Sequence, residues 1–94
     1  MALYAFVGFD HPDSMPRREV IRAEHRAYVR ANMSKIRVAG AFNNDQGQTG
    51  SLIVFETDSA DDVWAWIKAE PFYNGGIYQT VEVRRWDVVI GAIA

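Results

Sequence analysis

The order of hydrophobic patterns constrains this chain most: two helical patterns alternate with four strand patterns, and no linker separates them. Four segments rich in β-branched and aromatic residues predict strands: 3–9, 35–42, 51–57 and 78–86. Residues 15–32 and 58–70 predict helices, the first with Pro16 in its opening turn and the second ended by Pro71. The order is therefore β-α-β-β-α-β, in a single domain over residues 1–94.

This order is the ferredoxin-like plan, an α+β fold in which a four-stranded antiparallel sheet carries both helices on one face. The polar segment 43–50 is short enough for a hairpin, so the strands on either side of it should pair antiparallel. The other face of the sheet then has no cover. Several of the following residues are expected there, although parity along the strands stays open: Tyr4, Phe6, Val38, Ile53, Phe55 and Val83. Two such faces packed together would form a homodimer, a dimeric α+β barrel.

Composition excludes several classes of protein. The chain has no cysteine, which rules out a disulfide framework and a thiolate zinc site. Ten Lys and Arg stand against twelve Asp and Glu, without the basic excess of a nucleic-acid binder. The apolar start, residues 1–10, lacks a basic flank and is too short to span a bilayer. We therefore expect a cytoplasmic protein with neither a membrane nor a nucleic acid as its partner.

The first predicted helix has one side suited to face the sheet. Residues at offsets of three and four share that side: Ile21, His25, Tyr28, Val29 and Asn32. A competing stripe through Val20, Ala27 and Ala31 would bury the charge of Glu24, which is costly. The first side is therefore preferred, and it turns His25 inward or into a cleft at the edge of the sheet.

Short motifs along the whole chain resemble those of the YciI-related (YCII domain) family. They are Arg22-x-x-His25 in the first helix, Gly40 in "AGAF", the pair Gly50 and Ser51, and Pro71, Phe72, Gly76 and Tyr78 in "AEPFYNGGIY". Asp10, which closes the first strand, matches an acidic position common in the family. The resemblance implies a dimeric ferredoxin-like α+β barrel with a pocket in each subunit, where a histidine and an acid form a reactive pair.

This resemblance also implies a class of chemistry. One relative dechlorinates a hydroxylated aromatic ring, and neighbouring α+β barrel families isomerise lactones or oxidise polycyclic phenols. It thus favours a cofactor-free enzyme that moves a proton on a small phenolic or lactone-like molecule. One departure is that the family's aspartate before Pro–Phe is Glu70 here, whose side chain is longer by one methylene.

The resemblance assigns roles to individual residues. His25 would accept or donate the proton, since an imidazole does both near neutral pH. Glu70 or Asp10 would orient its ring, and the residues leave open which of them does so. Arg22 or Tyr78 would hold an oxygen of the ligand. The remaining residues expected at the ligand are Gly40, Ser51 and Phe72.

Each of these residues also has a purely structural interpretation. His25 would be an inert border histidine, Glu70 a solvated helix end, and Arg22 a surface partner of Glu19 or Glu24. The turn histidine His11 is expected to be solvated, and no second cluster completes a metal site with it. The rival function is a non-catalytic dimeric binding or accessory module. A carboxylate within hydrogen-bond reach of His25 would favour the enzyme.

Overall fold

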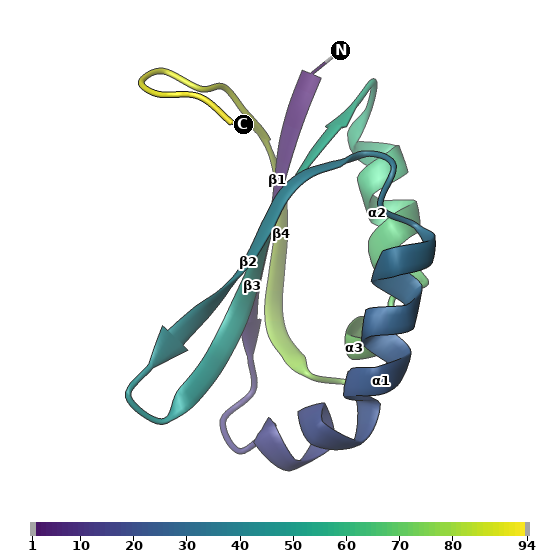
Figure 1. The fold of residues 1–94 in the computed structure, drawn as a ribbon, viewed down its shortest axis with the longest axis vertical. Helices are drawn as coiled ribbons and strands as arrows, with labels where there is room; N and C mark the ends of the chain where they lie inside the picture. The colour runs from purple at the N-terminus through teal and green to yellow at the C-terminus, as the bar shows by residue number, and fades with distance from the viewer. Residues whose placement is uncertain (1, 94) are drawn as a thin grey trace.

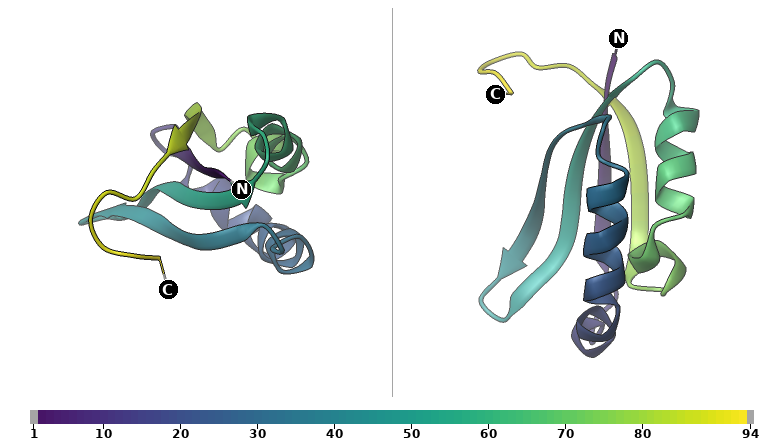
Figure 2. Two further views of the ribbon diagram at one scale, coloured as in Figure 1. Left: turned by 90° about the horizontal axis from the view of Figure 1, so that it is seen from above. Right: turned by 45° about the vertical axis from the view of Figure 1, so that its right-hand side comes forward.

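The computed structural model of the chain describes residues 2–93. Its single sheet has the strand order β2-β3-β1-β4. The strands are β1 (Ala2–Asp10), β2 (Ile36–Asn44), β3 (Gly47–Thr57) and β4 (Tyr78–Trp86). The helices are α1 (Met15–Ala31), α2 (Ala60–Lys68) and α3 (Pro71–Asn74), and they cover one face of the sheet (Figure 1; Figure 2). The predicted α+β, ferredoxin-like architecture is therefore confirmed.

All three strand pairings are antiparallel, including the predicted hairpin of β2 and β3. The expected loop over 43–50 is wrong in extent, because Asn43 pairs with Gln48 and Asn44 with Gly47. Only Asp45 and Gln46 remain outside the two strands. The free end of the hairpin bends away from the helical layer (Figure 1).

The hydrophobic core lies between the sheet and the helices. Phe6, Ile53 and Phe55 are buried there against Val63 and Ile67 of α2. Burial of side chains of this size contributes about 1.5–3 kcal/mol each. These contacts fix which face of every strand points towards the helices.

Six residues were candidates for the uncovered face of the sheet, and for five of them this prediction is wrong. Tyr4, Phe6, Ile53, Phe55 and Val83 belong to the core cluster or pack against it. The sequence hid this parity because β1 and β3 are apolar on both faces, so alternation gave no signal. The sixth residue, Val38, is the one that lies on the uncovered face, opposite Val54.

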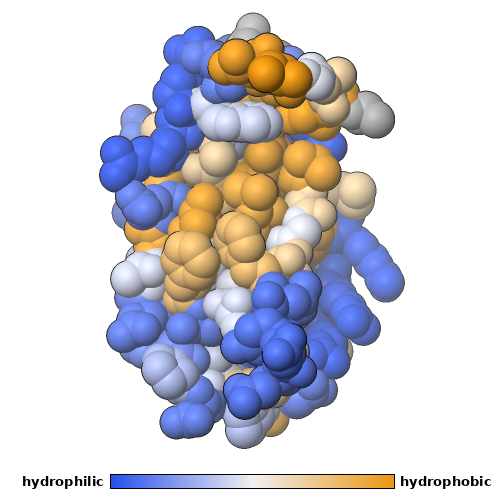
Figure 3. Space-filling model, turned by 90° about the vertical axis from the view of Figure 1, so that its left-hand side faces the viewer, coloured by the Kyte–Doolittle hydropathy of each residue, from blue (hydrophilic) through white to orange (hydrophobic). Residues whose placement is uncertain are grey.

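The uncovered face carries a continuous apolar surface. Alternation and register place on it Leu3, Ala5, Val7, Phe9, Val38, Phe42, Leu52, Val54 and Trp86. Figure 3 shows apolar side chains gathered in the middle and upper part of this face, with hydrophilic residues around them. On this face Phe9 and Val38 are each 46% exposed, which is high for large apolar side chains.

The predicted inward side of α1 is confirmed for most of its residues. Ile21, His25, Tyr28 and Val29 are partly buried, whereas Asn32 is exposed. The outward stripe holds Val20 at 84% exposure and an exposed Glu24, as the cost of burying that charge predicts. The most buried residue of the helix is one that sequence reasoning did not select, Arg18, which is 1% exposed.

The second predicted helix is divided in two by the structure. α2 ends at Lys68, and Glu70 then caps a separate helical turn, α3. Val63 and Ile67 form the buried face of α2, and Gly76 takes the positive φ of +70° that its turn needs. No helix within residues 2–93 has both the length and the apolar character to cross a bilayer.

Candidate active site

His25 and Glu70, which lie 45 residues apart in the sequence, meet between α1 and α3. Nδ1 of His25 is hydrogen-bonded to Oε1 of Glu70. The Glu70 side chain is 2% exposed and that of His25 is 21% exposed. The structure therefore brings together a buried acid and an imidazole that solvent still reaches.

The start of α3 fixes the position of the Glu70 carboxylate. Glu70 is the N-cap of this helix: Oε1 accepts the backbone N–H of Phe72 at 3.0 Å and Oε2 accepts that of Tyr73 at 3.1 Å. Pro71, at the first helical position, has no N–H that would need a partner. With both oxygens bonded to its own helix, the carboxylate presents a fixed acceptor to α1. The longer glutamate side chain thus spans both its own helix cap and the imidazole.

Phe72 fixes the plane of the imidazole. Its ring stacks on that of His25 with centroids 3.8 Å apart and an angle of 11° between the planes. The guanidinium carbon of Arg18 lies over the same ring, 4.4 Å from its centroid. One ring face has no room for both groups at these distances, so Phe72 lies between Arg18 and His25.

This geometry assigns a tautomer to His25. An ionised carboxylate is an acceptor only, so Nδ1 must carry the hydrogen of the bond to Glu70. In the neutral ring the lone pair then resides on Nε2. His25 can therefore act as a base through Nε2, while Glu70 stabilises the charge that proton uptake creates.

Of the two acids that the sequence left open, Glu70 contacts His25 and Asp10 binds elsewhere. Both oxygens of Asp10 accept from Arg18, Nε at 2.5 Å and Nη2 at 3.0 Å. The two side chains are 4% and 1% exposed. Arg18 was missed, yet its position seven residues before His25 on the inward stripe was a readable signal, because a buried arginine requires a partner.

Tyr78 and Ser51 meet on the helix side of the sheet. The Tyr78 hydroxyl donates a long hydrogen bond of 3.4 Å to Oγ of Ser51. Burial, and secondarily the negative charge of Glu70, raises the pKa of Tyr78 well above the usual tyrosine range. Gly8 makes room for the ring, since a Cβ there would lie 2.8 Å from Cδ1 of Tyr78. Tyr78 is therefore a protonated donor at neutral pH.

Two of the predicted ligand residues lie away from this cluster. Arg22 donates to Oε1 of Glu19 at 2.8 Å, which is the surface pairing that sequence analysis offered as its alternative role. Gly40 pairs with Leu52 on the uncovered side of the sheet, across the sheet from the helices. Within residues 2–93, neither residue forms a hydrogen bond or ion pair with another of the site residues.

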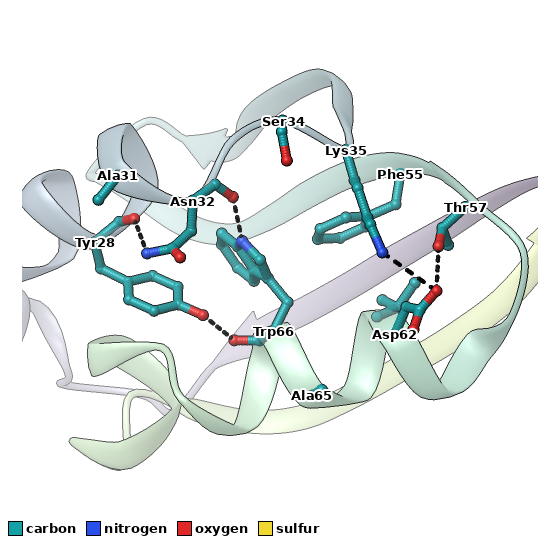
Figure 4. Close-up of a pocket in the computed structure, with 11 residues that line it drawn as sticks. Tyr28, Ala31, Asn32, Ser34, Lys35, Phe55, Thr57, Asp62, Ala65 and Trp66 are labelled. Atoms are coloured by element: carbon teal, nitrogen blue, oxygen red, sulfur yellow. Dashed lines mark hydrogen bonds and ion pairs between the residues drawn. The ribbon is translucent and has the colours of Figure 1, made fainter.

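Two cavities flank the His25 cluster. One, of about 420 Å³, lies between the loop after β1 and the β2–β3 hairpin, and Asp10 is in its wall. The other, of about 400 Å³, lies between the C-terminal end of α1 and α2 (Figure 4). Within residues 2–93, His25 lines neither of these two cavities.

Comparison with known proteins gives consistent results. Residues 2–87 match the YCII-related domain. Protein YciI of Escherichia coli O6:H1 (strain CFT073) is 30% identical over 91 residues, which cover 87% of this chain and 93% of that protein. Protein YciI of Shigella flexneri matches to the same extent.

Two solved structures are similar. The first is 5-chloro-2-hydroxyhydroquinone dehydrochlorinase (TftG) from Burkholderia phenoliruptrix AC1100, in complex with 2,5-dihydroxybenzoquinone. It is 30% identical with a TM-score of 0.81, and the match covers 90% of this chain and 93% of that one. Protein Atu4242 from Agrobacterium tumefaciens, at 14% identity and a TM-score of 0.55 over 95% of this chain and 94% of its own, supports the fold alone.

Proposed function

Because the chain belongs to the YCII-related family, we propose that it is a small enzyme in which His25 transfers a proton on a small organic molecule. Glu70 orients the imidazole and stabilises its protonated form. The substrate class is phenolic or lactone-like, and the reaction uses the His–acid pair without a bound cofactor.

The observation that carries this proposal is the fixed contact between Glu70 and His25. The Glu70 carboxylate is held by two backbone N–H groups, and Phe72 stacks on the imidazole. An inert surface histidine would not require contacts of this kind. These contacts hold one imidazole nitrogen as donor and leave the other for the substrate. A preorganised base of this kind contributes about 10²–10⁴-fold to the rate of a proton transfer.

The substrate class is supported by the similar structure. That protein is named as a dehydrochlorinase of a chlorinated hydroxyhydroquinone. Loss of HCl from a hydroxylated ring needs a base to take a proton as chloride leaves, and Nε2 of His25 suits that role. The buried, protonated Tyr78 hydroxyl would hold an oxygen of the ring.

We further propose that the protein works as a homodimer through its uncovered sheet face. Water would otherwise surround the apolar surface of that face, on which Phe9, Val38 and Trp86 are 40–46% exposed. A second copy presents an identical apolar surface, so two faces bury each other about a twofold axis.

The decisive experiment compares two histidine variants. We expect the purified protein to release chloride from 5-chloro-2-hydroxyhydroquinone, and His25→Gln to lower kcat by about 100-fold or more. His11→Gln is the matched control, because His11 is exposed in the turn after β1, and it should keep full activity. Glu70→Gln should lower kcat with little change in KM, because its amide no longer holds the required tautomer.

Thermal unfolding of each variant separates lost catalysis from lost structure. A folded His25→Gln protein with unchanged turnover would refute the proposal. If the folded wild-type protein binds hydroquinones without turning any of them over, the binding module becomes the better account.

A further inference from the structure

The cavity between α1 and α2 is a second candidate binding site, separate from the His25 cluster. Its volume is about 400 Å³, within the range of small-molecule pockets. Phe55 and Val63 contribute to its lining from β3 and α2, and Trp66 lies between Tyr28 and the Lys35 end (Figure 4). None of the residues assigned to proton transfer lines it.

Trp66 provides a rigid aromatic wall. Its indole Nε1 donates to the backbone oxygen of Asn32 at 2.7 Å. The rings of Tyr28 and Phe55 form T-shaped pairs with it, with centroid distances of 5.0 and 5.3 Å. A planar apolar group entering the cavity would therefore find a surface that is already in place, without the cost of ordering it.

The opposite end of the cavity carries a cation and an anion side by side. Nζ of Lys35 lies 3.4 Å from Oδ2 of Asp62, and Thr57 donates to the same oxygen at 2.5 Å. These two neighbours, Thr57 first, hold the pKa of Asp62 below its usual range, so it remains a carboxylate. The Lys35 and Asp62 side chains are 55% and 41% exposed, so an incoming ligand can reach both.

Both charged groups have bonding capacity left for a ligand. In the described chain, both recorded contacts of the Asp62 carboxylate use Oδ2, which leaves Oδ1 for another donor. The Lys35 ammonium has three N–H groups and one recorded partner. The Ser34 hydroxyl points towards the same space (Figure 4).

A dipolar ligand complements this arrangement best. A simple carboxylate would leave the cavity with a net negative charge beside Asp62, and a simple amine would leave it positive beside Lys35. The ammonium and carboxylate of a free α-amino acid are about 3 Å apart, close to the spacing of the two protein charges. Each ligand charge can thus face its opposite at the same time.

We propose that this cavity binds a free aromatic α-amino acid. Its ring lies on Trp66, its carboxylate on Lys35 and Ser34, and its ammonium on Asp62. The site is independent of the proton-transfer proposal, because it shares no catalytic residue with it.

The test is an NMR titration of the full chain with L-phenylalanine. We expect chemical-shift changes at the indole N–H of Trp66, assigned with Trp66→Phe, and at the backbone amides of Ser34 and Lys35. Phenylacetate lacks the ammonium, phenethylamine lacks the carboxylate and L-alanine lacks the ring. Each of these three should bind at least about tenfold more weakly than L-phenylalanine.

Two lysine variants locate the site. Lys35→Gln should weaken L-phenylalanine binding at least about tenfold, whereas Lys68→Gln, an exposed lysine of α2 outside the cavity, should leave it unchanged. Both lysines are exposed, so both variants should fold. Any one of three results overturns the proposal: no shift at Trp66 up to about 10 mM L-phenylalanine, phenylacetate binding as tightly as L-phenylalanine, or Lys35→Gln binding as well as wild type.

Discussion

At the scale of residues, the site contains two buried carboxylates with different partners. Glu70 contacts the imidazole itself, whereas the Asp10–Arg18 pair lies behind it. Arg18 lies over the ring of Phe72, which also stacks on His25. Asp10 is thus separated from His25 by Arg18 and Phe72.

The Asp10–Arg18 pair should be worth far more to stability than a surface pair. Asp10→Asn leaves the charge of a 1% exposed arginine without its counterion, so we expect a loss of about 3–5 kcal/mol in the free energy of unfolding. The control is Glu82→Gln in the exposed Glu82–Arg84 pair, which should cost less than about 1 kcal/mol. Urea unfolding of both variants measures the difference. Equal small losses would show that solvent reaches Arg18.

Because burial raises the pKa of Tyr78, we expect the free energy of unfolding to decrease in alkali. Its pKa is raised in the folded protein, so above about pH 10 the unfolded chain releases this proton while the folded chain keeps it. The contribution of the neutral phenol to the free energy of unfolding is fully present below that pH. Above it, this contribution falls by up to about 1.4 kcal/mol per pH unit. Tyr78→Phe should lack this component, so the stability difference between wild type and variant should shrink from pH 9 to pH 11. A difference that stays constant over this range would contradict the burial of the hydroxyl.

At the scale of elements, the one-turn helix α3 positions the site. A four-residue helix has little stability of its own, and it persists here because Glu70 caps it and Phe72 is buried at 2% exposure. The same carboxylate that caps α3 also binds His25 of α1. The Glu70 side chain thus holds both this turn and the contact with His25.

The pairing of β1 with β3 depends on a close approach at Gly50. A Cβ at this position would lie 2.3 Å from the backbone oxygen of Gly8, so Gly50→Ala must push the two strands apart. We expect a loss of about 1–3 kcal/mol in the free energy of unfolding. Gly40→Ala, in the neighbouring strand, is the matched control, since a Cβ there meets no atom within 4 Å. Thermal or urea unfolding would contradict the close approach if the two variants were equally stable.

At the scale of the whole molecule, the helices cover one face of the sheet and leave the other face uncovered (Figure 1; Figure 2). The apolar patch of Figure 3 is the surface on which a second copy is proposed to dock. The C-terminal segment after β4 leaves the sheet on this same side, with Val89 and Ile90 about nine-tenths exposed (Figure 1).

The dimer proposal predicts that a single charge on this face gives monomers. Val38→Glu would place two carboxylates in an apolar interface, and we expect dimerisation to weaken at least about 100-fold. Val20→Glu is the matched control, because Val20 is exposed on the outward side of α1. Sedimentation analysis over a range of concentrations measures both. A wild-type protein that stays monomeric, or a Val38→Glu variant that stays dimeric, would contradict the proposal.

The sequence by itself determined the element order, the antiparallel hairpin and the inward side of α1, and it selected His25 and Glu70 as candidates for a pair. Periodicity and proline positions are local signals, and they are legible in one chain. The motif Arg22-x-x-His25 and the Glu70–Pro71–Phe72 turn are likewise local, because each is a short stretch of consecutive residues.

Only the tertiary structure decided how these pieces meet. It chose Glu70 over Asp10 as the partner of His25, because that choice depends on where α3 docks against α1 across 45 residues of sequence. It also decided the parity of β1 and β3, since strands that are apolar on both faces carry no alternation to read. The role of Arg18 likewise arises only from long-range contacts, with Asp10 and Phe72, which local pattern does not encode.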